Sequence, residues 1–125
     1  MAYGTLQTDV INSSTGLFST NNAYSGIAKA WVNYNGSSQT INSSFNVSSV
    51  TRNGTGDYTV NFATSMPNTL YCVAGSCVGS SANWAYAVQT QNSALSTGSV
   101  RFTTGYTNAQ SQQDVTNASI VIFSN

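Results

Sequence analysis

Short runs of β-branched and aromatic residues, separated by clusters of Gly, Ser and Asn, constrain the fold of this chain more than any other feature. Val, Ile, Thr, Tyr and Phe suit a pleated, half-buried surface. They gather in segments 26–34, 45–51, 57–63, 70–74, 84–89, 99–104 and 118–123. No segment carries the i, i+3, i+4, i+7 spacing of an amphipathic helix. The pattern predicts an all-β chain, folded as an antiparallel β-sandwich or barrel-like single domain.

The strongest local prediction is a hairpin in which segments 45–51 and 57–63 flank the turn sequence Arg52-Asn53-Gly54-Thr55-Gly56. In the second strand Tyr58, Val60 and Phe62 alternate with polar residues, so one face is expected to be buried and the other wet. In the first strand the apolar alternation changes phase, which predicts a β-bulge near Ser48 and Ser49.

A further strand is predicted over 26–34, ending at the turn dipeptide Asn35-Gly36. One face of this strand carries Ile27, Lys29, Trp31 and Asn33, and the other carries Ala28, Ala30, Val32 and Tyr34. Both faces are expected to be largely buried. Segments 92–98 and 107–116 are expected to be exposed loops.

The first 25 residues are predicted to form an extended N-terminal arm or edge hairpin, followed by a β-sandwich domain over 26–125. Apolar residues in the arm are sparse and follow no sustained period, so the arm cannot build a core alone. We expect it to pack on a neighbouring subunit, with a flexible tail as the alternative. The candidate assembly contacts are Leu6, Val10, Ile11, Leu17, Phe18 and Tyr24.

Most polar residues in this sequence are uncharged. Charged residues make up 5% of the 125-residue chain, against about 25% in average domains. The formal net charge is 0, so there is no basic patch to attract nucleic acid. A neutral surface lacks the mutual repulsion that keeps copies apart, and so suits assembly. Neither a signal peptide nor a membrane-spanning run is visible, so synthesis in the cytoplasm is expected.

Residues that usually perform catalysis are scarce. The chain contains no His and no Glu, and its three Asp residues share no motif. We therefore expect no enzymatic activity, no metal and no cofactor. Arg52 and Asp57 are predicted to pair across their turn.

Cys72 and Cys77, five residues apart, would lie on opposite faces of a straight strand. Two free thiols are expected in a protein made in the cytoplasm. The alternative is a disulfide, which would need a turn at Gly75-Ser76.

The aromatic residues admit two interpretations. Those that alternate as in a core are Trp31, Tyr58, Phe62, Tyr71, Trp84 and Phe102. Those near predicted turns or loops are Tyr3, Tyr24, Tyr34 and Tyr106, and these are candidates for exposed contact. Exposed Tyr side chains among Asn, Ser and Thr are also compatible with carbohydrate binding.

Two stretches resemble a known family: Lys-Ala-Trp-Val-Asn-Tyr-Asn-Gly at 29–36, and 44–63 with Met66-Pro67 and Tyr71 following. They are similar to a virion structural domain, often labelled tail-fibre-like, of tailed phages that infect cyanobacteria and other marine bacteria. The opening Tyr3-Gly4-Thr5-Leu6 is similar too. The resemblance implies a non-enzymatic β-domain displayed on the virion surface, often as a homotrimer.

A chain of this length is expected to have room for neither a virion-attachment domain nor an elongated shaft. This favours a capsid decoration (cement) protein that stabilises the head, with the major capsid protein or other virion proteins as partners. The alternative is a tail-fibre tip that contacts host surface glycan through the loops at 92–98 and 107–116. Neither nucleic acid nor a membrane is an expected partner.

Overall fold

The structure is a computed structural model, and it describes residues 10–13, 16–19, 26–79, 86–107 and 111–125. Strands dominate these residues, as predicted. The strands are β1 (Val10–Ser13), β2 (Gly16–Ser19), β3 (Ala30–Asn35), β4 (Thr40–Phe45), β5 (Val47–Gly54), β6 (Asp57–Phe62), β7 (Cys72–Val78), β8 (Tyr86–Leu95), β9 (Ser99–Tyr106) and β10 (Asn117–Phe123).

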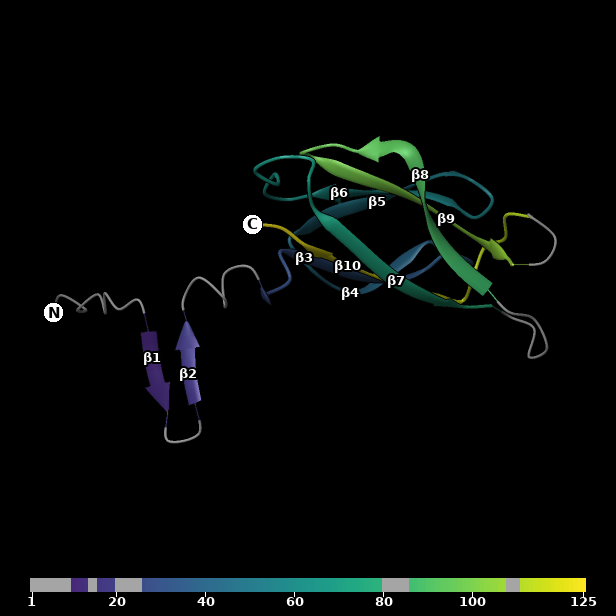
Figure 1. Cartoon of the computed structure of the whole chain (residues 1–125). Coiled ribbons are helices and arrows are strands. Elements are labelled where there is room, and N and C mark those ends of the chain that lie inside the picture. Colours follow the sequence, from purple (N-terminus) through teal and green to yellow (C-terminus); the bar gives the residue numbers. More distant parts are fainter. Residues whose placement is uncertain (1–9, 14–15, 20–25, 80–85, 108–110) are drawn as a thin grey trace, which may run out of the picture.

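Eight of these strands form two four-stranded antiparallel sheets that pack as a sandwich (Figure 1). Sheet I has the order β4-β3-β10-β7, and sheet II has the order β5-β6-β9-β8. The chain crosses from sheet I to sheet II between β4 and β5, and again between β7 and β8. Strand β10 returns to the middle of sheet I, between β3 and β7. The predicted sandwich is therefore confirmed.

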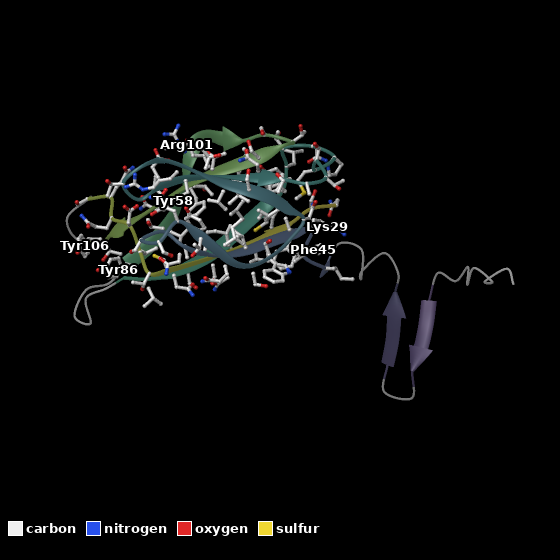
Figure 2. All side chains as sticks on the ribbon, turned by 180° about the vertical axis from the view of Figure 1, so that it is seen from behind. Lys29, Phe45, Tyr58, Tyr86, Arg101 and Tyr106 are labelled. Atoms are coloured by element: carbon white, nitrogen blue, oxygen red, sulfur yellow. The ribbon has the colours of Figure 1, made fainter. Side chains whose placement is uncertain are left out.

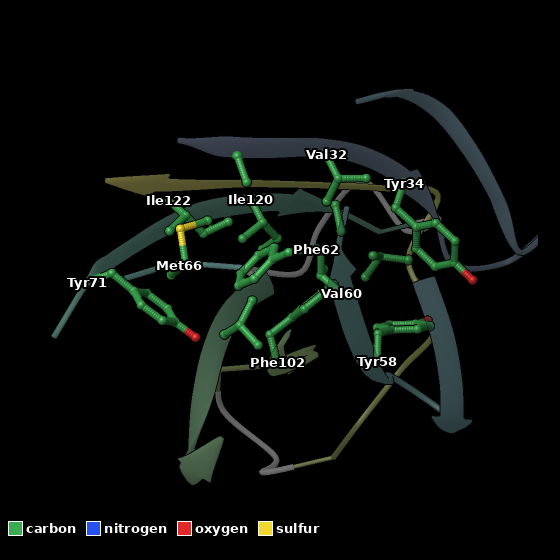
Figure 3. Packing of buried hydrophobic residues seen from close by; sticks show 14 residues of the cluster. Val32, Tyr34, Tyr58, Val60, Phe62, Met66, Tyr71, Phe102, Ile120 and Ile122 are labelled. Carbon is green, nitrogen blue, oxygen red and sulfur yellow. The ribbon is translucent and has the colours of Figure 1, made fainter. Parts of the chain in front are cut away.

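The core lies between the two sheets and follows the alternation of the central strands (Figure 3). Strand β6 buries every second residue from Tyr58 to Phe62, and β10 buries every second residue from Ala118 to Ile122. The Tyr58 ring packs edge-on against Tyr34, with centroids 5.2 Å apart. Among the described residues, the buried hydrophobic side chains are Ala30, Val32, Tyr34, Tyr58, Val60, Phe62, Met66, Tyr71, Val100, Phe102, Val115, Ala118, Ile120 and Ile122.

The prediction that both faces of the strand near Trp31 are buried is wrong. Strand β3 begins at Ala30, so Ile27 and Lys29 precede it. Only its inward residues are buried, whereas Trp31 points outward and is 37% exposed. The cause is architectural, because each sheet of a two-layer sandwich has one face on the core and one face on the outside.

Strand β4 was not predicted, because its sequence Thr-Ile-Asn-Ser-Ser-Phe carries no apolar alternation and all six residues are exposed. The expected strand over 45–51 is divided at Asn46, which has a positive φ of 54°. Asn tolerates this left-handed conformation better than most residues. Its side chain holds the corner, since Nδ2 donates to Lys29 O at 2.9 Å and Oδ1 accepts from Thr64 N at 2.7 Å.

The predicted hairpin is confirmed as β5 and β6, joined by Thr55 and Gly56. The register between the two strands shifts between Val47 and Ser49, so the bulge predicted near Ser48 is present. A second shift lies between Arg52 and Gly54.

Other boundaries differ from the expectations. The predicted strand over 70–74 starts later, at Cys72, and Leu70 is 89% exposed. Strand β8 continues to Leu95, so the loop predicted over 92–98 is partly strand. The segment before β10 is not simply an exposed loop, because Val115 is fully buried. Trp84 lies outside the described residues.

Candidate assembly surface

Sheet I is uncharged along all four of its strands. None of β3, β4, β7 and β10 contains Asp, Glu, Lys or Arg. Four of the six charged side chains gather elsewhere, with Arg52, Asp57 and Arg101 on sheet II and Asp114 in the segment before β10. The outer face of sheet I can therefore be covered without desolvating a charge that its strands carry.

An apolar row runs across this outer face, formed by Phe45, Trp31, Val121 and Ala74. These residues are successive cross-strand neighbours from β4 through β3 and β10 to β7. Phe45 is 53% exposed and Trp31 is 37% exposed. Directly opposed residues of antiparallel strands share one face. The register therefore converts four distant sequence positions into one continuous apolar strip.

A polar row lies beside the apolar row and is held together by side-chain amides. Asn33 Nδ2 donates to Asn117 Oδ1 and to Ser119 Oγ, both at 3.1 Å. Asn42 Nδ2 donates to Asn33 Oδ1 at 2.8 Å. A hollow of about 450 Å³ lies on this part of sheet I, bounded by residues that include Trp31 and Ser119. These bonds fix the positions of the amides without adding charge.

A second hollow, of about 330 Å³, lies where the chain enters β3. Its lining includes Ile27, Lys29, Phe45, Pro67 and Asn125. Ile27 is 57% exposed. Since Phe45 belongs both to this hollow and to the apolar row, the two form one continuous surface that begins at the root of the N-terminal segment.

The candidate contacts predicted in the arm fall partly within the described residues. Val10 and Ile11 lie on β1, and Leu17 and Phe18 lie on β2. The two strands pair as an antiparallel hairpin in which Ile11 is opposite Phe18. Leu6 and Tyr24 lie outside the described residues. Among the described strands, β1 and β2 pair only with each other.

Charged residues make two ion pairs, and neither is the predicted one. Arg52 pairs with Asp114, and Arg101 pairs with Asp57. The predicted pairing of Arg52 with Asp57 is wrong because Arg52 is opposite Tyr58 in the register. Asp57, one residue away from Tyr58, therefore points to the other face.

Asp114 is the centre of the more connected cluster. Its Oδ2 accepts from Arg52 Nη2 at 2.6 Å, and its Oδ1 accepts from Gly56 N at 2.9 Å and from the Tyr58 hydroxyl. Burial by itself raises the pKa of Asp114, but the bonds from Arg52, Gly56 and Tyr58 outweigh it and lower the pKa to about 2. Burial, followed by the bond to Asp114, raises the pKa of Tyr58.

Asp57 is ionised by a similar arrangement. Its pKa is lowered first by hydrogen bonds from Arg101, one of which joins Arg101 Nε to Asp57 Oδ1 at 2.8 Å. Carboxylates held in this state at neutral pH act as fixed hydrogen-bond acceptors rather than as proton donors. The Asp114 cluster joins β5 to the segment before β10, and the pair of Asp57 with Arg101 joins β6 to β9. Among the described residues, no group of three or more His, Cys, Asp or Glu is placed to hold a metal.

A polar pocket of about 340 Å³ lies on the opposite side of the molecule. It is formed between β8, β9 and the segment at Ser111 and Gln112. Tyr106 N donates to Ser111 O at 3.1 Å, and Gly105 pairs with Gln112 as an isolated bridge. The lining is Ala87, Gln89, Thr103, Thr104, Gly105, Tyr106, Thr107, Ser111 and Gln112, which contains no charged side chain.

Of the Tyr residues predicted to be exposed, Tyr106 is half-buried beside this pocket, with its ring centroid 4.9 Å from that of Tyr86. Figure 2 shows both rings at the end of the sandwich away from Phe45. The prediction for Tyr34 is wrong, because it is 2% exposed in the core. Tyr3 and Tyr24 lie outside the described residues.

Cys72 and Cys77 are free thiols on opposite faces of β7, as predicted. Cys72 points outward opposite Phe123, whereas Cys77 is half-buried and packs against the core. Burial raises the pKa of the Cys77 thiol.

The sequence missed the apolar row, because its members come from four strands and meet only through the register. The one available indication was Trp31 on a strand whose other face is already apolar. In the part of the chain that the structure describes, no helix has the length and apolar character needed to cross a membrane. No protein-family model, curated protein or solved structure matches this chain.

Proposed function

We propose that this protein is a non-enzymatic structural protein of a tailed-phage virion, where it decorates the surface of the head. The observation that carries the assembly role is the exposed apolar row of Phe45, Trp31, Val121 and Ala74 on an uncharged sheet. The resemblance of residues 29–36 and 44–63 to a phage virion domain supports assignment to a phage virion. The length of the chain, rather than the resemblance, favours the head over the tail.

The apolar row favours assembly through the hydrophobic effect. Burying apolar area contributes about 25 cal/mol per Å², and large aromatic residues dominate the energetics of interfaces. A decoration protein binds many equivalent sites on one particle, so a modest contact at each site adds to the cohesion of the whole shell. A homotrimer seated at a junction between capsid subunits would repeat the contact three times.

The head-decoration role is tested with phage heads that lack the protein. Purified protein is expected to bind such heads saturably and to raise their resistance to heat or osmotic shock. The double variant Trp31→Ser/Phe45→Ser is expected to lose head binding while keeping its fold, since both side chains are exposed. Leu70→Ser is the matched control, because Leu70 is a more exposed apolar residue outside the row. Wild-type protein that fails to bind heads would overturn the proposal.

A second candidate function, contact with host surface glycan at a tail-fibre tip, is favoured by the polar pocket beside Tyr106. Amide and hydroxyl groups next to an aromatic ring suit neutral polyhydroxylated ligands, because they offer hydrogen bonds without requiring charge. If this candidate is correct, the protein binds host cells but not heads. Gln112→Ala would then weaken binding to cells, whereas Trp31→Ser/Phe45→Ser would leave it unchanged.

A further inference from the structure

We infer that the β1-β2 hairpin of one copy docks on the outer face of sheet I of a second copy, against the apolar row at Phe45 and Trp31. The inference rests on the proposed assembly role and assigns the apolar row to the contact between copies. Trp31→Ser/Phe45→Ser would then lose head binding because the assembled state that binds heads is lost. It does not depend on which part of a phage particle the protein occupies.

The hairpin needs a partner. Strands β1 and β2 have four residues each and pair only with each other among the described strands. A two-stranded hairpin by itself is marginally stable in water, and stable sheets require further strands or a packed apolar face. The hairpin sequences Val-Ile-Asn-Ser and Gly-Leu-Phe-Ser contain four large apolar residues and no charge.

The outer face of sheet I has the complementary properties. It offers an apolar strip on four strands without charge, and Lys29 is the one charged side chain among the described residues that lines the hollow beside it. Its edge strand β4 contains no Pro, Lys or other charged residue, and all six of its residues are exposed. Natural proteins usually protect such an edge with charges, Pro or a covering segment. A segment docked at Phe45 contacts both the apolar row and this open edge.

Strand β5, which follows β4 in the chain and is an edge strand of sheet II, is not free of charge. Strand β5 carries Arg52, which is held by Asp114. Covering β5 would therefore bring a hairpin against a charged cluster, at a desolvation cost that sheet I does not impose. The strands of sheet I therefore form the receiving face with the lower desolvation cost.

The geometry favours a second copy as the donor. In Figure 1 the hairpin lies off the end of the sandwich rather than over sheet I of its own chain. The hollow at Ile27 makes the root of the N-terminal segment continuous with the receiving row through Phe45. Each copy therefore donates a hairpin and receives one at adjacent places. Repeating such a contact around a rotation axis closes a ring without leaving either element unpaired.

Photo-crosslinking between isotopically light and heavy copies tests the inference. Phe45 of the full chain is replaced by the photoreactive aromatic residue p-benzoylphenylalanine, and both labelled forms are unfolded and refolded together. Trypsin cleaves after Lys29, Arg52 and Arg101, so the hairpin lies in peptide 1–29 and position 45 lies in peptide 30–52. We expect crosslinked pairs of these two peptides in which one is heavy and the other light, with fragmentation placing the crosslink within residues 10–19. Ile27 lines the same hollow as Phe45 in one chain, so a crosslink at residues 26–29 does not count as hairpin contact.

The matched control places the same photoreactive residue at Thr51, an exposed position of sheet II in the same tryptic peptide. This variant is expected to give no crosslink to peptide 1–29. Crosslinks that join only peptides of the same isotope would show a hairpin folded back on its own chain and would overturn the inference. Absence of any crosslink from position 45 to residues 10–19 would overturn it as well.

A second measurement separates this inference from the proposed function. Sedimentation velocity of Phe45→Ser is expected to show a loss of the assembled species relative to wild type and Leu70→Ser. An unchanged distribution would contradict the docking site. If the protein binds heads and assembles without exchanging hairpins, the decoration role is retained. Only the hairpin docking is then rejected.

Discussion

The carboxylate of Asp114 lies 2.6 Å from the guanidinium of Arg52, and this contact joins β5 to the segment that leads into β10. The two residues are 62 positions apart in the chain. The side chain of Asp114 is 25% exposed, so the pair is partly shielded from water. Through Gly56 N and the Tyr58 hydroxyl, the same carboxylate also fixes the β5-β6 turn and reaches the core.

Replacing Asp114 by Asn is expected to lower the free energy of unfolding by about 1–3 kcal/mol, because hydrogen bonds to a charged acceptor are each worth about that much. The amide keeps the size of the side chain but loses the negative charge and one acceptor. Urea denaturation measures the change. Leu70→Lys alters the net charge equally at a residue that is 89% exposed, and is expected to be neutral. Equal effects of the two variants would contradict a specific role for the Asp114 cluster.

Acid is expected to destabilise the fold between about pH 4 and pH 2. The pKa of Asp114 is lowered from 3.8 to about 2 in the folded protein. A carboxyl with a depressed folded pKa contributes stability that is present above its unfolded pKa and is lost as the pH falls through the folded value. The contribution from Asp114 is about 2 kcal/mol. Asp57, with its lowered pKa, acts in the same direction.

Urea titrations at a series of pH values test this dependence. The chain has no His, so stability is expected to be flat between about pH 5 and pH 8. Burial raises the pKa of Tyr34, Tyr58 and Tyr71 above 10.0, so stability is expected to fall again as the pH rises above about 10. Asp114→Asn is expected to reduce the acid slope, and an unchanged slope would count against the assignment to Asp114.

Substitution of Gly56 is expected to be costly, whereas the same substitution at nearby Gly54 is expected to be tolerated. Gly56 has a φ of 64°, and a Cβ there would lie 2.5 Å from Gln113 N and from Thr104 O. These are backbone atoms that cannot move aside. A Cβ at Gly54 meets nothing within 4 Å. Gly56→Ala is expected to lower stability by at least about 1–3 kcal/mol, measured by thermal or urea unfolding. Similar midpoints for the two variants would refute the close approach.

The two thiols are expected to react at different rates with a disulfide reagent such as Ellman's reagent. Cys72 is exposed, and Cys77 is half-buried against the core with a raised pKa. The thiolate is the reactive form, so burial slows Cys77 both by access and by ionisation. Cys72→Ser is expected to remove the fast phase, and Cys77→Ser is expected to leave it. A native protein without reagent-accessible thiol would instead indicate a disulfide.

The predictable part of this fold is the part encoded by local sequence. The β5-β6 hairpin has a turn sequence and a clean alternation from Tyr58 to Phe62, and both act within a few residues. Strand β4 lacks such information, because its polar sequence becomes a strand only by pairing with β3. The exposure of Trp31 and the burial of Tyr34 likewise depend on which face of β3 meets sheet II.

In the candidate assembly surface, too, features encoded by local sequence could be predicted and features that depend on strand pairing could not. The prediction that apolar residues in the first 25 positions make assembly contacts rests on the sequence, because these residues are too sparse to build a core of their own. The apolar row could not be predicted from the sequence. Its members become neighbours only through three strand registers, which bring together Phe45, Trp31, Val121 and Ala74. The pairing of Arg52 with Asp114 could not be predicted from local sequence either, since the two residues are 62 positions apart.

The absence of charge from the strands of sheet I sets how contacts through this face respond to ionic strength. Attraction between exposed charges fades within a Debye length of about 10 Å at 0.1 M salt. A contact built from apolar area and neutral amides has no such term to lose, and salts that strengthen apolar burial reinforce it. Contacts made by these four strands would therefore hold at least as firmly in concentrated salt as in dilute buffer.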